Sequence, residues 1–570
     1  MENADSSVEI SAEAFLARIA ERGVDYVFAN AGTDFAPIIE AIARNHNGRR
    51  KFPRAITVPH ENVAMAMAHG YYRIAGKPAA VMVHVNVGTA NAICGLINAA
   101  RDNVPVLLAA GRTPITESGN AASRNRSIHW GQEMFDQGGL VREMVKWDYE
   151  LRAGQPVASV VDRALDIAMS EPRGPVYLTL PREVLAAPAI ASRRNGRRPL
   201  GASPAVASHT AIEQAARILA DAEFPLVITS AAGRQPAAVA ALAALAEDFA
   251  LPVVQNEARD LNLPTDHAMH LGFQSAPWLD KADAILVLES VVPWIPHAAA
   301  PRRDATIIHM SGDPLAARYP FREIETDLLI TGEITSGLTM LRAALGEATK
   351  GKAAAIAARH KTITAAHDDM IAKRRAMIEK VRNQRPIHPA WLAACVSEQK
   401  AQDAIVISEL GLGIGNLDLT APGSYMGNLI SGGLGFALGA GLGAKLAAPD
   451  REVIVSCGDG SYMFGNPIPY HFVGQAEKLP TLTIVTNNLS WHAVRVSTLD
   501  VYPDGSAAKA NTMPLTELTP SPQFEKAIEI CGGYGEKLEN PAEVPAALGR
   551  AFDKVRSGTP AMLNVITHGR

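Results

Sequence analysis

Short apolar runs alternate with longer helical patterns along the whole chain, and this alternation restricts the possible folds more than any other feature. The first third contains VDYVFAN, AAVMVHV, VPVLLAAG and PVYLTLP. The middle third contains FPLVITS, LPVVQN, ADAILVLES, ATIIHM and DLLIT, and the last third DAIVISE, REVIVSCGDG, PTLTIVTNN and PAMLNVIT. Such runs are typical of parallel strands buried on both faces. The sequence therefore predicts an α/β protein with three doubly wound parallel-sheet domains.

Length and composition agree with several globular domains. The chain has 570 residues, of which 48% are hydrophobic and 20% charged, as in ordinary folded proteins. An Arg/Pro/Ser-rich segment at 187–208 and an Ala/Lys/Arg-rich segment at 348–385 are predicted connections, and the second should contain a long exposed helix. The predicted domains are residues 1–187, 205–347 and 376–570.

Several functional classes are disfavoured. A net charge of −4 without a basic stripe argues against nucleic acid, and RRNGRRP at 193–199 is interpreted as a solvated linker. The four cysteines have no CxxC spacing, so we expect neither disulfides nor a zinc site. The acidic N-terminal residues and the lack of a bilayer-length apolar run predict a cytoplasmic protein that does not enter a membrane. No GxGxxG follows a strand in the middle third, which argues against a dehydrogenase.

The most specific motif is GDGS at 458–461, which closes one apolar run, followed by a pair of asparagines at the end of the next run. Mg²⁺ prefers oxygen ligands. The Asp459 carboxylate, the Asn488 amide oxygen and the Ser490 main-chain carbonyl are its predicted protein ligands. Each motif alone is also a good turn, but their occurrence at two consecutive strand ends favours a metal site.

The same motif predicts a diphosphate site, because a polyanionic diphosphate needs a divalent cation. Gly458 and Gly460 would let the backbone approach the phosphates closely. The helix that should follow Ser461 would point its N-terminal amides at them.

With these motifs the sequence resembles, over essentially its whole length, the thiamine-diphosphate enzymes of the acetolactate synthase, benzoylformate decarboxylase and benzaldehyde lyase group. The resemblance implies thiamine diphosphate and Mg²⁺ as cofactors and a 2-oxo acid, aldehyde or acyloin as substrate. It also implies that the N-terminal domain binds the pyrimidine ring and the C-terminal domain the diphosphate. The expected assembly is a homodimer or a dimer of dimers, a homotetramer, with active sites at the subunit interface. FAD in the central domain is left open but is not favoured.

Three residues of the N-terminal third match the family pattern. Glu61 in HENVAMAMAHGYYR corresponds to the carboxyl group that hydrogen-bonds the pyrimidine N1′. His84 in VMVHVNVGTANA aligns with a decarboxylase histidine that assists proton transfers, although a lone histidine after a strand is often structural. Thr33 in NAGTDFAP occupies the pocket position where benzoylformate decarboxylase has serine.

The segment SGGLGFAL at 431–438 resembles the part of benzoylformate decarboxylase that bends the cofactor. By this resemblance Leu434 supports the bent cofactor and the Gly432 carbonyl accepts a hydrogen bond from its 4′-amino group. The strand end SELGLG lacks the side chains that many relatives place near the diphosphate, so we expect the backbone amides of Gly411 and Gly413 to replace them.

Residues after the metal motif and in one N-terminal loop bear on the substrate. Trp491 and His492 should lie near the cofactor and the substrate entrance. His492 replaces a glycine common in relatives, and an acid–base role and a packing change are both left open. Gln132 and Lys146 resemble an acetolactate synthase segment that borders the active site.

The first hypothesis is a thiamine-diphosphate-dependent 2-oxo acid decarboxylase or lyase with carboligase activity, which His84 and SGGLGFAL favour. An acetolactate synthase-like carboligase that condenses two 2-oxo acids is the alternative, which the Gln132 segment favours. A 2-hydroxyacyl-CoA lyase and a catalytically silent cofactor-binding homologue are also retained, because fold alone does not determine function.

Overall fold

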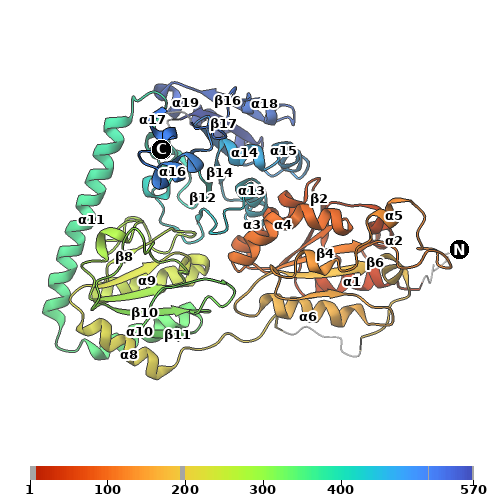
Figure 1. Cartoon of the computed structure of the whole chain (residues 1–570), viewed down its shortest axis with the longest axis horizontal. Coiled ribbons are helices and arrows are strands. Elements are labelled where there is room, and N and C mark those ends of the chain that lie inside the picture. Colours follow the sequence, from red (N-terminus) through yellow and green to blue (C-terminus); the bar gives the residue numbers. More distant parts are fainter. Residues whose placement is uncertain (1–7, 193–198, 511–512, 568–570) are drawn as a thin grey trace. The chain divides into compact units, whose positions relative to one another are not determined.

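The computed structural model describes residues 8–192, 199–510 and 513–567 (Figure 1). It contains three all-parallel sheets of six, five and six strands, which confirms the predicted fold class. Most of the arginine-rich linker predicted at 193–199 lies outside the described residues. No helix among the described residues is long and apolar enough to cross a membrane.

The first sheet has the strand order β2-β1-β3-β4-β6-β5. Its strands are β1 (Tyr26–Ala29), β2 (Arg54–Thr57), β3 (Ala79–Val83), β4 (Val106–Arg112), β5 (Asp148–Glu150) and β6 (Val176–Pro181). The connecting elements are α1 (Ser11–Glu21), η1 (Thr33–Phe35), α2 (Ala36–Arg44), α3 (Glu61–Ala75), α4 (Val85–Arg101), α5 (Ile128–Gly131), η2 (Gly138–Leu140), α6 (Val157–Met169) and α7 (Arg182–Ala186). Side chains of α1, α2 and α6 share one apolar core with the strands.

The central sheet has the strand order β11-β10-β9-β7-β8. Its strands are β7 (Pro225–Thr229), β8 (Val253–Val254), β9 (Ala284–Leu288), β10 (Thr306–Ser311) and β11 (Leu328–Thr331). Its helices are α8 (His209–Asp221), η3 (Ala232–Arg234), α9 (Pro236–Phe249), η4 (Ala276–Trp278) and α10 (Ile334–Ala348). The strand order reverses between β7 and β9, where nucleotides bind in folds of this type. The hydroxyls of Ser230 and Ser290 meet there at 2.7 Å, and both residues are buried.

The third sheet, β13-β12-β14-β15-β17-β16, repeats the strand order of the first when each is numbered from its own beginning. Its strands are β12 (Ile405–Glu409), β13 (Tyr425–Met426), β14 (Val453–Gly458), β15 (Leu482–Asn487), β16 (Tyr534–Leu538) and β17 (Ala561–Ile566). The helices in this stretch of the chain are α12 (Pro389–Gln399), η5 (Ile414–Asn416), α13 (Phe436–Ala447), α14 (Asp459–Phe464), α15 (Pro467–Ala476), α16 (His492–Val501), α17 (Ser506–Ala510), α18 (Phe524–Glu529), η6 (Pro541–Glu543) and α19 (Val544–Arg556).

The chain forms two compact units. The first unit combines the residues up to Ser203 with the segments 429–449 and 463–479, which carry α13 and α15. The second unit contains the central and third sheets. The predicted domain 376–570 includes both α13 and α15, which this division assigns to the first unit. A division into two units does not test the limits of three domains, so these limits stay predictions.

The long exposed helix predicted between the second and third domains is present as α11 (Ala353–Val381), which has 29 residues (Figure 1). Only Ile363 and His367 of this helix are buried. The His367 imidazole Nδ1 lies 2.9 Å from the His270 carbonyl oxygen, which ties α11 to the loop after β8.

Candidate functional site

Glu61 begins α3 and is held by two asparagines. Its Oε1 accepts a hydrogen bond from Asn30, at the end of β1, at 2.9 Å, and its Oε2 accepts one from Asn91 on α4. Only 7% of Glu61 is exposed. A Cβ at Gly88 of α4 would lie 3.2 Å from the Glu61 carboxylate, so α4 passes close to it. These contacts therefore fix the direction of the Glu61 carboxyl group. The predicted hydrogen bond to a single ring nitrogen would require such a fixed direction.

The segment before α13 lies against α3 and α4. Asn98 of α4 donates to the Gly433 carbonyl at 2.8 Å and accepts hydrogen bonds from the Gly433 amide and the Ser431 hydroxyl. Asn62 donates to the Leu434 carbonyl at 3.3 Å. The residue beside Glu61 thus contacts the residue predicted to support the bent cofactor. Gly432 has the left-handed φ of 62° and is exposed.

Helices α3 and α13 cross with their backbones in contact. A Cβ at Gly443 would lie 2.0 Å from the Met67 carbonyl oxygen, and one at Gly70 would lie 2.1 Å from the Ala440 carbonyl oxygen. Side chains at these two positions are therefore excluded. The same helix pair can form between two copies of a chain by exchange, so the prediction that the active sites lie at a subunit interface stays a proposal.

His84 lies at the N-terminus of α4 and is paired with a carboxylate. Its Nδ1 is 2.5 Å from Asp34 Oδ1, and Asp34 is buried. The hydrogen bond that His84 donates to Asp34 raises the pKa of His84 above its usual value, against the lowering effect of burial. Val85, the next residue, has the positive φ of 32°, a conformation that costs a β-branched residue about 1–3 kcal/mol. Strain of this kind is often found at functional sites.

Thr33 is in contact with a second histidine. Its hydroxyl lies 3.4 Å from Nε2 of His129, which is buried. Burial, followed by the charges of Arg182, Arg124 and Arg126, lowers the pKa of His129. Gln132, whose Oε1 is buried without a hydrogen-bond partner among the described residues, lies near enough to His84 to contribute to its raised pKa. The structure therefore brings Thr33, His84 and Gln132 together.

Asp459 lies where β14 passes directly into α14 in the second unit. It is 2% exposed, and within the described part of the chain its Oδ2 has no hydrogen-bond partner. Burial raises the pKa of Asp459, against the lowering effect of the backbone N–H groups of Gly460, Leu489 and Ser490. The loop after β15 therefore faces this carboxylate, as the metal prediction requires.

The other predicted metal ligands lie in that loop. Asn488 Oδ1 accepts hydrogen bonds from the Ser490 amide at 3.1 Å and the Ser490 hydroxyl at 3.0 Å, and the Ser490 carbonyl accepts one from the His492 amide at 2.9 Å. Among the described residues, no group of three or more His, Cys, Asp or Glu side chains could hold a metal. A cation here would depend on one carboxylate together with neutral oxygens, and the unpartnered Asp459 Oδ2 fits such an ion.

Packing accounts for two of the predicted cofactor-binding glycines. A Cβ at Gly460 would lie 2.3 Å from the Trp491 ring, and one at Gly411 would lie 2.2 Å from the Ser456 hydroxyl. Gly413 precedes η5, and Gly458 ends β14.

Two further polar groups near this motif lack partners. The Ser461 hydroxyl and His492 Nε2 are buried without a hydrogen-bond partner among the described residues. Buried polar atoms without partners are rare in folded proteins, so these groups, like Asp459, are suited to meeting a ligand.

Comparison with known proteins gives two matching family models. The model described as "Thiamine pyrophosphate enzyme, N-terminal TPP binding domain" matches residues 11–140, and the one described as "Thiamine pyrophosphate enzyme, C-terminal TPP binding domain" matches residues 413–565. The chain belongs to the thiamine pyrophosphate enzyme family. The resemblance found in the sequence is thereby confirmed.

Relatives of this thiamine pyrophosphate enzyme include an acetolactate synthase large subunit from Mycobacterium tuberculosis, 25% identical over 96% of the chain and 94% of that protein. A benzoylformate decarboxylase from Pseudomonas aeruginosa is 26% identical over 84% of the chain and 85% of that protein. The solved structure of a 4-hydroxybenzoylformate decarboxylase from Rhodococcus jostii RHA1 covers 99% of the chain and 100% of its own, with a TM-score of 0.76 at 22% identity. The enzyme thus belongs with decarboxylases and acetolactate synthases.

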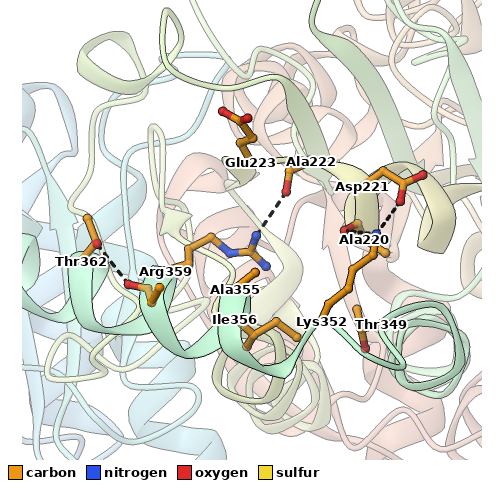
Figure 2. Close-up of a pocket in the computed structure, with 11 residues that line it drawn as sticks. Ala220, Asp221, Ala222, Glu223, Thr349, Lys352, Ala355, Ile356, Arg359 and Thr362 are labelled. Atoms are coloured by element: carbon orange, nitrogen blue, oxygen red, sulfur yellow. Dashed lines mark hydrogen bonds and ion pairs between the residues drawn. The ribbon is translucent and has the colours of Figure 1, made fainter.

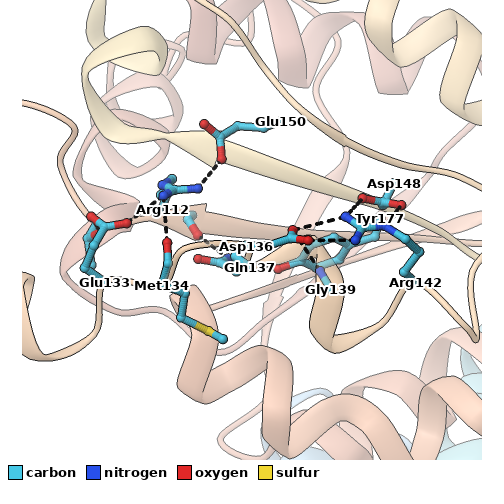
Figure 3. Close-up of polar contacts among 12 residues, drawn as sticks. Arg112, Glu133, Met134, Asp136, Gln137, Gly139, Arg142, Asp148, Glu150 and Tyr177 are labelled. Carbon is cyan, nitrogen blue, oxygen red and sulfur yellow. Dashed lines mark hydrogen bonds and ion pairs between the residues drawn. The ribbon is translucent and has the colours of Figure 1, made fainter.

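Side-chain hydrogen bonds hold the segment 133–139 against the first sheet of the enzyme (Figure 3). Arg112, at the end of β4, donates to Glu133 at 2.6 Å, to the Met134 carbonyl at 2.9 Å and to Glu150. Gln137 donates to the Gly111 carbonyl and to the Tyr177 hydroxyl, both at 2.9 Å. This network fixes the segment that follows Gln132.

Lys146 donates a hydrogen bond to another part of the first unit. Its ammonium group donates to the Ser170 carbonyl, at the end of α6, at 2.6 Å. The resemblance of this segment to acetolactate synthase stays a prediction.

Sequence reasoning missed Asp34 and His129. Asp34 directly follows Thr33 in NAGTDFAP, and an acidic residue beside a proposed pocket residue was a usable signal. His129 lies three residues before Gln132. Its contact with Thr33 depends on tertiary packing, so no local pattern indicated it.

A pocket of about 480 Å³ in the second unit lies between the end of α8 and the start of α11 (Figure 2). Arg359 donates to the carbonyls of Ala222, Phe249 and Ala250 at 2.8–3.2 Å. Lys352 donates to the Ala220 carbonyl at 3.0 Å and pairs with the Asp221 carboxylate. Both cations of the pocket therefore satisfy helix ends, and we assign no catalytic role to it.

Proposed function

We propose that this enzyme is a thiamine-diphosphate- and Mg²⁺-dependent 2-oxo acid decarboxylase or lyase with carboligase activity. The observation that carries the proposal is the pair of His84 and Asp34, at 2.5 Å, in the same unit as Glu61. A histidine held in this way suits the delivery and removal of protons during carbon–carbon bond cleavage. The relatives named as decarboxylases give the proposal further support.

The N-terminal residues would bind and activate the pyrimidine end of the cofactor. Glu61 would share a proton with the ring nitrogen N1′, while Asn30 and Asn91 hold its carboxylate. Leu434 would support the bent conformation, and Gly432 would accept a hydrogen bond from the 4′-amino group. When bound, thiamine diphosphate supplies a nucleophilic carbon that adds to the carbonyl and accepts the electron pair released on cleavage.

Residues at strand ends of the third sheet would hold the diphosphate end of the cofactor. Asp459, Asn488 and Ser490 would provide the protein ligands of Mg²⁺, and Asn488 would exchange its hydrogen bond from the Ser490 hydroxyl for the metal. The residues proposed to contact the diphosphate or lie beside it are Gly411, Gly413, Gly458, Gly460, Ser461, Trp491 and His492. For His492, an acid–base role and a packing role both remain open hypotheses.

The second candidate is an acetolactate synthase-like carboligase. Its specific support is the proximity of Gln132 to His84, together with the 25% identical relative of that name. Pyruvate and benzoylformate, supplied separately, distinguish the two candidates. Benzaldehyde and CO₂ from benzoylformate would support the first candidate, and acetolactate as the main product from pyruvate would support the second.

The general test is a panel of 2-oxo acids and acyloins with detection of aldehyde and CO₂, and Glu61→Gln serves as the inactive control. Tight binding of thiamine diphosphate without turnover of any member would contradict both candidates and favour a silent homologue. The visible spectrum of the purified protein reports whether FAD is bound, since bound flavin absorbs visible light.

A further inference from the structure

Two consecutive residues of η1 contact two different histidines. Asp34 reaches His84 at the N-terminus of α4, and the Thr33 hydroxyl reaches His129 on α5. Arg182 donates to the Thr33 carbonyl at 3.4 Å and to the carbonyls of Ala122 and Ser123, which fixes the turn against the loop before α5. The turn therefore connects three separate elements of the first unit.

The Asp34 carboxylate has almost no room to move. A Cβ at Gly111 would lie 1.8 Å from Asp34 Oδ2, and a Cβ at Gly32 would lie 2.1 Å from His84 Nδ1. The Val85 amide also donates to Asp34 Oδ2, at 3.3 Å. Because an ionised carboxylate only accepts hydrogen bonds, His84 Nδ1 carries a proton. His84 then exchanges its second proton through Nε2.

His129 has the opposite arrangement. Its Nδ1 lies 3.3 Å from the amide of Asn125, and a backbone N–H only donates. The neutral ring therefore carries its proton on Nε2, which donates to the Thr33 hydroxyl oxygen. Since that oxygen accepts a hydrogen bond from His129, the proton of the Thr33 hydroxyl is directed to another acceptor.

The surrounding charges agree with this division. The pKa of His84 is raised chiefly by Asp34, with a smaller contribution from Glu61 of α3. The pKa of His129 is lowered by burial and then by Arg182, Arg124, Arg126 and His84 itself. Burial, and to a smaller extent the charge of Asp34, raises the pKa of Tyr177 on β6. Neighbouring groups whose pKa values are moved apart are typical of acid–base sites.

We propose that the turn assigns different tasks to the two histidines: Asp34 is a positioning residue that keeps a deliverable proton on His84 Nε2, and His129 is a positioning residue that makes the Thr33 hydroxyl a donor to an oxygen of the bound 2-oxo acid. The substrate part of this inference rests on the proposed function. The proton positions on the two histidines follow from the hydrogen bonds within the protein and do not depend on the substrate.

The proton positions are tested by NMR of the full-length chain labelled with ¹³C at histidine Cε1, without substrate. His84→Gln and His129→Gln assign the two signals by their loss. We expect His84 to titrate above and His129 below the ordinary histidine range, and Asp34→Asn to move the His84 titration to lower pH while leaving His129 nearly unchanged. A His84 titration that does not respond to Asp34→Asn, or a His129 that is charged at neutral pH, would overturn the proposal.

Steady-state kinetics test the consequences. Asp34→Asn should lower kcat roughly 100-fold or more, as removal of the charged partner does in other His–Asp pairs, and should move the alkaline limb of the pH profile to lower pH. Thr33→Val should raise KM for the 2-oxo acid about 10-fold through the loss of one hydrogen bond, and Thr33→Ser should restore it. His129→Leu should behave like Thr33→Val. Equal kinetics for Thr33→Val and the wild type would overturn the assignment of the hydroxyl.

The two proposals fail in different ways. If the NMR titrations follow the expectation but no 2-oxo acid is turned over, the proposed function is wrong and the proton positions stand. If 2-oxo acids are turned over but Asp34→Asn changes neither the titration nor the pH profile, the positioning role is wrong and the proposed function stands. Circular dichroism of each variant confirms that a change in kinetics does not come from unfolding.

Discussion

The two parts of the proposed site differ in how their reactive groups are satisfied. In the first unit, Glu61 and His84 have protein partners at 2.5–2.9 Å. In the second unit, Asp459 Oδ2, the Ser461 hydroxyl and His492 Nε2 are buried without partners among the described residues. Each such atom costs about 1–3 kcal/mol. The reactive groups of the first part are therefore satisfied by the protein itself, whereas those of the second leave buried polar atoms that the proposed ion and diphosphate would satisfy.

The largest effect is expected from Asp459→Ala. Loss of the only charged protein ligand should weaken thiamine diphosphate binding in the presence of Mg²⁺ by at least about 100-fold, or roughly 2.7 kcal/mol. Isothermal titration calorimetry with and without Mg²⁺ measures this effect. Equal affinity under both conditions in the wild type would contradict the metal assignment.

The isosteric variant Asp459→Asn makes the contrast sharper. Without cofactor, its free energy of unfolding should equal that of the wild type or exceed it by about 1 kcal/mol. The reason is that the substitution removes a buried carboxylate that lacks a full set of hydrogen-bond partners. Stability should therefore be kept or gained while binding is lost. A large loss of stability in the cofactor-free chain would mean that Asp459 is mainly structural.

Glu61→Gln should give the next largest effect. Turnover and proton exchange at the reactive carbon of the cofactor should fall roughly 100- to 10,000-fold, because an amide cannot supply the proton to N1′. Binding of the cofactor, measured by calorimetry, should change little. Glu40→Gln is the control, since Glu40 is exposed and pairs with Arg44 on its own helix. A near-normal exchange rate in Glu61→Gln would remove Glu61 from the activating role.

Gly443→Ala tests the helix crossing that sets Leu434 beside Asn62. Because the added Cβ would lie 2.0 Å from the Met67 carbonyl, we expect a loss of about 3 kcal/mol in unfolding free energy, in the upper range for overpacked positions. Gly346→Ala on α10 is the matched control: nothing lies within 4 Å of its Cβ, so it should stabilise by about 0.5 kcal/mol. Denaturant unfolding of both variants measures the difference, and equal effects would place α13 elsewhere.

Mixing inactive Glu61→Gln and Asp459→Ala chains tests whether the two parts come from different subunits. If sites are shared in a two-fold dimer, random exchange should restore about a quarter of the wild-type activity, since half of the dimers would each hold one intact site. Mass spectrometry confirms that exchange has taken place. Mixed dimers without activity would mean that both parts come from one chain.

The smallest effect concerns pH and stability. Because the folded-state pKa of His84 is raised, its pair with Asp34 stabilises the fold fully below the unfolded histidine pKa, about 6.5. This contribution is lost as pH rises through the folded pKa. Asp34→Asn should therefore cost about 1 kcal/mol at pH 6 and less at pH 9. Thermal unfolding at the two pH values measures it, and an equal cost at both would argue against a charged pair.

The sequence predicted much of this arrangement. The three parallel sheets follow from apolar runs, because strands buried on both faces leave a continuous apolar pattern. The GDGS motif pointed to Asp459 and the family resemblance to Glu61 and His84, and the structure places each at the start of a helix beside a strand end. These predictions depended on short local patterns, which a sequence displays directly.

What could not be predicted depends on contacts between distant segments. Asp34 is held against His84 by the small volume at Gly32 and Gly111, which are far apart in the sequence. Nothing local indicates that α13 groups with the first unit. A side chain whose role comes from its neighbours across the sheet has no signature in its own segment.

The repeated strand order gives the two ends of the proposed site a common layout. His84 follows β3, the third strand of the first sheet, and Asp459 follows β14, the third strand of the third sheet. Asn30 and Leu410 likewise follow the first strand of each sheet. An ancestral duplication would produce this correspondence: one framework occurs twice, with a histidine after the third strand of one copy and an aspartate after the third strand of the other.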